Sequence, residues 1–130
     1  MNTKLLMTVT SITLALAGIV SLFAPDVVLS SLDVPVTGGS SVMVQLLGAF
    51  YFAFALMDWT AKDSAIGGIY ARPVSLGNFS HFFAGALLLI KAQLSQDFNL
   101  PVFLVSVVYV AFAVLFYWLV FRATGVRAGE

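Results

Sequence analysis

Residues 101–121 read PVFLVSVVYVAFAVLFYWLVF, a run of 21 residues without a charged side chain. A helix needs about 20 apolar residues to cross the roughly 30 Å of hydrocarbon in a bilayer. Three further apolar blocks of similar length precede this run, at residues 5–24, 41–60 and 74–93. The sequence therefore predicts an all-α integral membrane protein with four spanning helices.

The composition supports lipid as the main solvent. Hydrophobic residues make up 61% of the 130 positions and charged residues only 9%, and the mean hydropathy is +1.04. A soluble globule with a charged surface is excluded by these values. A lipid-facing β-barrel does not fit either, because the blocks are continuously apolar and do not alternate with a period of two. The net charge of zero argues against a nucleic-acid partner.

The basic residues favour one orientation, because lysine and arginine are enriched in cytoplasmic loops. Those outside the blocks lie before the first block, between the second and third, and after the fourth: Lys4, Lys62, Arg72, Arg122 and Arg127. The loops of the other side carry Asp26, Asp33 and Asp97. We expect both termini to be cytoplasmic, with Lys91 at the outer end of the third block as the exception, its stem reaching the interface.

The first block also resembles a secretory signal peptide, since Lys4 precedes it and Ala15-Leu16-Ala17 resembles a cleavage motif. The apolar run nevertheless continues to Ala24. We therefore expect a retained helix. Because short links make neighbouring helices antiparallel, residues 1–130 are predicted to form one transmembrane domain, an up-down-up-down four-helix bundle.

The first outer connection, residues 23–35, reads FAPDVVLSSLDVP. Pro25 suits the first turn of a helix and Asp26 favours its positive end. The segment is predicted to be a short interfacial helix, with Val27, Val28 and Leu32 on one side and Pro35 at its end. Residues 61–72, which include Gly67-Gly68, predict a flexible inner loop, and residues 95–100 a tight outer turn.

Small residues indicate where helices pack closely in lipid, since apolar bulk alone does not drive helix association there. One such stripe runs through the first block, and small pairs occur in the second and third: Ser11, Ala15, Gly18 and Leu22, then Gly48-Ala49, then Ala84-Gly85. Close packing of the first three spanning helices explains them. A contact between copies of the chain is the alternative that the sequence leaves open.

Polar groups at membrane depth are the candidates for binding, because burying them in lipid costs free energy unless they are bonded. Counting about 1.5 Å per residue from the inner boundary places one layer of polar groups at Ser11, Tyr51 and His81, and an outer layer at Gln45, Lys91 and Ser106. Tyr109 lies between the two layers. The candidate ligand-binding residues are Gln45, Lys91, Tyr109, Ser106, His81 and Tyr51.

The single histidine, His81, is a ligand, a proton carrier or a hydrogen-bonded structural residue. A metal site needs further strong ligands, and the chain has no cysteine, so no metal ligand is assigned. No cofactor is indicated. The first block contains no acid of the kind on which small multidrug transporters depend, and no glutamate precedes Glu130, which argues against glutathione-dependent membrane enzymes.

Three motifs resemble the DoxX-like group of small bacterial membrane proteins: residues 23–35, Gln45-Leu-Leu-Gly-Ala-Phe, and Asn78-Phe-Ser-His-Phe-Phe-Ala-Gly. Many relatives carry arginine where Gln45 aligns, so the resemblance transfers no catalytic residue. It implies a four-helix bundle of the bacterial inner membrane. The name-giving members are similar to subunits of a membrane oxidoreductase that passes electrons to quinone.

The leading hypothesis is a non-catalytic inner-membrane bundle that packs against itself or serves as an accessory subunit of a larger complex. The alternative is a binder or carrier of a small amphipathic molecule, a quinone or lipid, held by Gln45, Lys91 and Tyr109. Under that alternative, replacing Gln45 by leucine removes ligand retention. An enzyme using His81 as acid or base is a third hypothesis.

Overall fold

The computed structural model describes residues 2–63, 72–95 and 97–121, and these ranges contain five α-helices and no strand. The helices are α1 (Thr3–Phe23), α2 (Pro25–Ser31), α3 (Gly38–Ala61), α4 (Arg72–Ser95) and α5 (Leu100–Phe121). All except α2 are long and apolar enough to cross a membrane. This confirms the prediction of an all-helical chain with four helices of spanning length, whose observed ends lie within three residues of the predicted ones.

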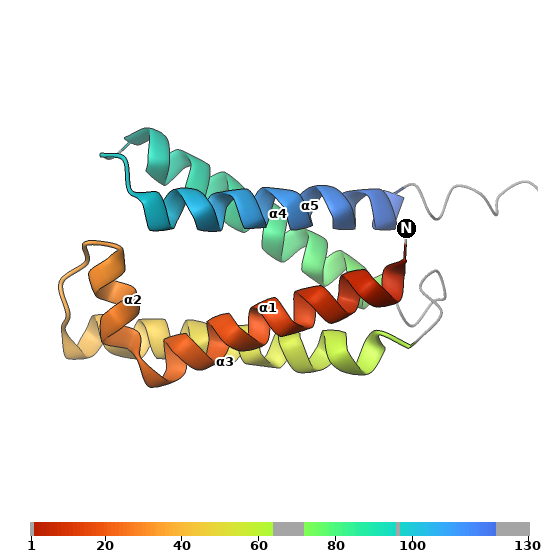
Figure 1. Ribbon diagram of the computed structural model, residues 1–130, viewed down its shortest axis with the longest axis horizontal. Coiled ribbons are helices and arrows are strands. Elements are labelled where there is room, and N and C mark those ends of the chain that lie inside the picture. The colour runs from red at the N-terminus through yellow and green to blue at the C-terminus, as the bar shows by residue number, and fades with distance from the viewer. Residues whose placement is uncertain (1, 64–71, 96, 122–130) are drawn as a thin grey trace, which may run out of the picture. The chain divides into compact units, whose positions relative to one another are not determined.

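The helices belong to two compact units, Met1–Asp63 with α1 to α3 and Ser64–Glu130 with α4 and α5 (Figure 1). Two predictions depend on how these units combine: that residues 1–130 form a single domain, and that all four long helices follow an up-down-up-down order. Both stay predictions. The predicted inner loop with Gly67-Gly68 lies outside the described residues, as do Arg122 and Arg127.

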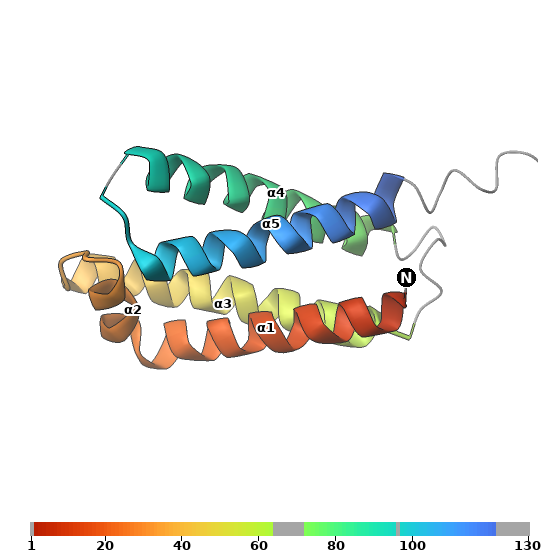
Figure 2. The same cartoon turned by 45° about the horizontal axis from the view of Figure 1, so that its top comes forward.

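In the first unit, α1 and α3 run side by side and antiparallel (Figures 1 and 2). Contacts at four levels fix their register. From one end to the other they join Lys4 with Asp63, Ser11 with Ala55, Gly18 with Gly48, and Leu22 with Gln45. The first three of these α1 positions recur every seven residues, the spacing at which one face of a helix stays turned toward its neighbour.

Two glycines set the distance between α1 and α3. A Cβ atom built on Gly18 would lie 2.9 Å from the carbonyl oxygen of Gly48, and one built on Gly48 would lie 2.8 Å from Cβ of Ser21. Both distances are shorter than real carbon contacts, and part of what they meet is backbone that cannot rotate away. The stripe predicted from small residues therefore includes a true helix contact at Gly18 and Gly48, whereas the neighbouring Ala49 is exposed.

The short helix α2 begins at Pro25, as predicted, but ends at Ser31, before the predicted end at Pro35. Its buried residue is Leu29, 3% exposed, whereas Val27 is 59% exposed. After Ser31 the chain turns through Asp33 with a φ of 57°, and the amide of Val34 donates to the carbonyl of Leu29 at 3.0 Å, which is the bonding pattern of a Schellman cap.

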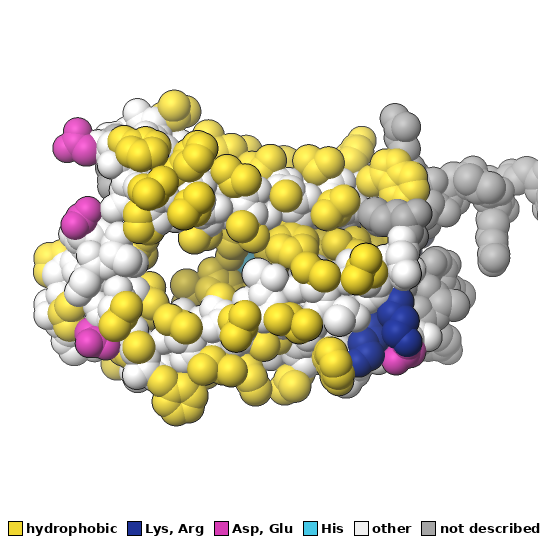
Figure 3. Space-filling model, viewed as in Figure 1, with side chains coloured by type: hydrophobic (Ala, Val, Ile, Leu, Met, Phe, Trp, Pro, Cys, Tyr) yellow, Lys and Arg dark blue, Asp and Glu magenta, His cyan; other side chains and the backbone are white. Residues whose placement is uncertain are grey.

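The outward surface of the helices is strongly apolar, and Figure 3 shows hydrophobic side chains covering the face in view. Leucines such as Leu16 and Leu88, one from each unit, are 61% and 69% exposed. In water such surfaces drive association. Four helices of spanning length with this surface fit a multi-pass membrane protein.

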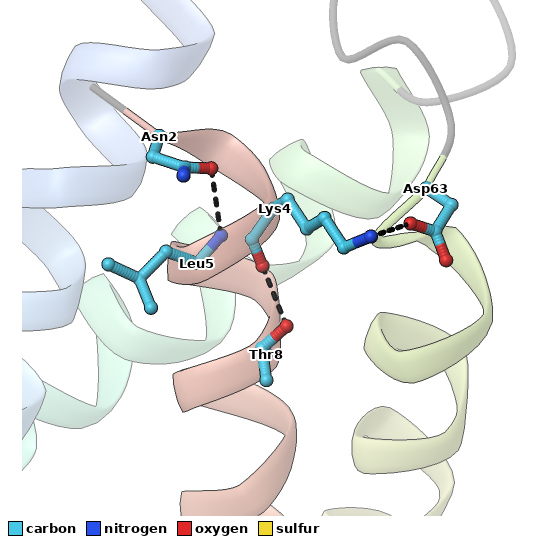
Figure 4. A network of polar contacts seen from close by, with 5 residues as sticks. All are labelled: Asn2, Lys4, Leu5, Thr8 and Asp63. Carbon is cyan, nitrogen blue, oxygen red and sulfur yellow. Dashed lines mark hydrogen bonds and ion pairs between the residues drawn. The ribbon is translucent and has the colours of Figure 1, made fainter.

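One end of the α1–α3 pair carries an ion pair between Lys4 Nζ and Asp63 Oδ1, 2.6 Å apart (Figure 4). Beside it, Nζ of Lys62 lies 2.8 Å from the centre of the Trp59 ring, a cation–π contact. The hydrogen bond from Lys4 lowers the pKa of Asp63 below its ordinary value. Both side chains of the ion pair are more than 60% exposed, so its contribution to stability is small and weakened by salt.

The lowered pKa of Asp63 predicts a specific pH dependence. Because the pKa is lower in the folded state, the ion pair contributes stability at pH values above about 3.8 and loses it as the pH falls through the folded pKa. We expect Asp63→Asn to lower the melting temperature slightly at pH 7 in low salt, and the difference from the unmodified chain to vanish near pH 2. Melting curves of both proteins in the same lipid–detergent mixture measure this. A difference that persisted undiminished at pH 2 would show that the ion pair is not its cause.

Candidate functional site

In the second unit, α4 and α5 are joined by a hydrogen bond at mid-helix. The Tyr109 hydroxyl lies 3.2 Å from Nε2 of His81, and the imidazole tautomer decides which group donates. The rings of these two residues also contact each other, with centroids 5.4 Å apart. His81 is the tenth residue of α4, about 13 Å along the helix axis from its start.

The Tyr109 ring is held in place by its surroundings. It lies edge-on to Phe82, 5.2 Å between centroids, and directly over Gly85, where a Cβ atom would collide with two of its ring carbons. Phe82 is itself 1% exposed and stacks on Phe112. Glycine at position 85 therefore provides the space for the tyrosine, and the tyrosine brings its hydroxyl to His81.

A groove lies between α4 and α5 toward the ends joined by their short connection, with a volume of about 350 Å³. Its lining comes from both helices: Ile90, Gln93 and Leu94 of α4, and Phe103, Ser106, Val107 and Val110 of α5. The α5 positions follow the spacing of one helix face. Asn99 fixes the start of α5, because its side-chain oxygen accepts a hydrogen bond from the amide of Val102 at 3.1 Å.

Two polar side chains line the groove, and they differ in their hydrogen bonding. The hydroxyl of Ser106 donates to the carbonyl of Val102 on its own helix, at 2.7 Å. The Nε2 atom of Gln93 is buried and has no hydrogen-bond partner among the described residues. Buried polar groups are normally bonded, so an unbonded amide nitrogen at this position is unusual.

The other candidate residues are distributed between the two units. Gln45 belongs to the first, and its Nε2 donates to the carbonyl of Leu22 at 3.1 Å, which holds α3 to α1. Tyr51 is half-buried in the same unit, and Lys91 is exposed in the second. The two predicted polar layers each combine residues of both units, so the layers stay a prediction.

The structure brings together His81 with Tyr109, and places Ser106 in the α4–α5 groove. It adds Gln93, which was not among the candidate residues although it stands at the end of the third predicted block. The signal for Gln93 was an amide three residues after Ile90 near a helix end, and that signal alone does not give the direction of the side chain. Among the described residues no group of three or more His, Cys, Asp or Glu side chains could hold a metal ion.

Comparison with known proteins gives no match among protein-family models, curated protein sequences or solved structures. The resemblance to the DoxX-like group therefore stays a prediction that rests on the three sequence motifs.

Proposed function

We propose that the chain is a non-catalytic helical bundle of the bacterial inner membrane that acts by association, either with further copies of itself or as an accessory subunit of a larger membrane complex. Four apolar helices of spanning length support the membrane assignment. The basic residues Lys4 and Lys62 at one end of the α1–α3 pair, with Asp26 and Asp33 in the connection at the other end, support cytoplasmic termini.

The observation that best supports this proposal is that polar side chains inside the spanning helices form hydrogen bonds within the protein. Side chains that bond to a neighbouring helix include Ser11, which donates to the Ala55 carbonyl at 2.7 Å, Gln45, which donates to the Leu22 carbonyl, and Tyr109, which bonds to His81. Others bond to carbonyls of their own helix, as Thr10 does with Leu6 at 2.9 Å. Side chains used in this way hold helices together, which is the requirement of a structural subunit.

Native mass spectrometry of the protein, extracted gently with its lipids, tests this proposal. We expect the dominant species to be either a whole multiple of 13.9 kDa, larger than one chain, or a complex with one reproducible second polypeptide. A spectrum that contained only single chains under several mild detergents, at concentrations matching the native membrane, would contradict the proposal.

The α4–α5 groove favours a second candidate function, the binding of a small amphipathic molecule. The groove is almost entirely apolar, with Gln93 and Ser106 as its polar lining residues among those the structure describes. This lining matches a ligand with a large hydrocarbon part, such as a lipid or a quinone. A subunit that associates and a subunit that binds lipid are compatible roles.

A further inference from the structure

We draw no further inference here: the strongest candidate, the exposed face of α3 that carries Gln45, Ala49 and Ala53, is a stripe of small residues beside one amide, and nothing in the part of the chain that the structure describes shows what covers it.

Discussion

Replacing Gly48 by leucine is expected to separate α1 from α3 and to lower the free energy of unfolding by about 3 kcal/mol or more. The reason is that the added Cβ would lie 2.9 Å from the carbonyl oxygen of Gly18 and 2.8 Å from Cβ of Ser21. The helices must move apart to admit it. That movement also stretches the bonds from Ser11 to Ala55 and from Gln45 to Leu22, which hold the same register.

The adjacent residue provides a matched control for this variant. Ala49 is exposed, so Ala49→Leu adds similar bulk to the same turn of α3 without meeting α1. The comparison is made by thermal or denaturant unfolding in one lipid–detergent mixture. Equal stability of the Gly48→Leu and Ala49→Leu variants would show that the two helices do not meet at Gly48.

A cross-linking readout makes the same test specific to register. The chain has no cysteine, so Lys4→Cys and Asp63→Cys introduce a single thiol pair at positions whose side chains touch in the structure. A short bis-maleimide, which forms a thioether bond with each thiol, should join them in the otherwise unmodified chain. We expect the yield to fall sharply when Gly48→Leu is added and to be unchanged when Ala49→Leu is added.

The second large effect is expected at Gly85, where a leucine displaces the Tyr109 ring that covers this position. The ring has little room to yield, because it is only 8% exposed, touches Phe82 and is bonded to His81. Overpacking costs about 1 to 3 kcal/mol. This exceeds the gain of roughly 0.5 to 1 kcal/mol from removing a glycine within a helix, so the variant is expected to be less stable.

The neighbouring Ala84 is exposed, and Ala84→Leu is therefore the control for Gly85→Leu. A second substitution tests the cause. In a Tyr109→Ala background, the space over Gly85 is open, and we expect Gly85→Leu to cost much less there than in the unmodified chain. The double-mutant comparison is read from unfolding free energies. An equal cost in both backgrounds would remove Tyr109 as the source of the effect.

Much of the fold was predictable because continuous apolar length alone determines which segments span a membrane. The four long helices agree with the four apolar blocks, and Pro25 correctly marked the start of α2. Gly18 and Gly48 were recognisable as a helix contact because only residues without large side chains let two backbones approach closely. These signals depend on residue size and polarity, which can be read directly from the sequence.

Helix rotation was not predictable from the sequence, so the details that depend on it come from the structure alone. On α2 the buried residue is Leu29, because the position of α2 against its neighbours, and not its own pattern of valines and leucines, selects the face. Gln93 was missed for a similar reason, since phenylalanines, leucines and valines fit a helix contact and lipid equally well and leave the direction of the amide open. The partner of Gln45 was likewise found only once the register of α1 and α3 was known.

The proposed role in association is tested most directly by photo-cross-linking in intact membranes, without extraction. A photoreactive residue is placed at Leu16 or at Leu88, exposed positions of the two units, and then at successive exposed positions along α1, α3, α4 and α5. We predict that a contiguous set of positions yields a protein adduct of constant mass, either a second copy of the 13.9 kDa chain or one additional polypeptide. Adducts with lipid alone at every exposed position would contradict the account.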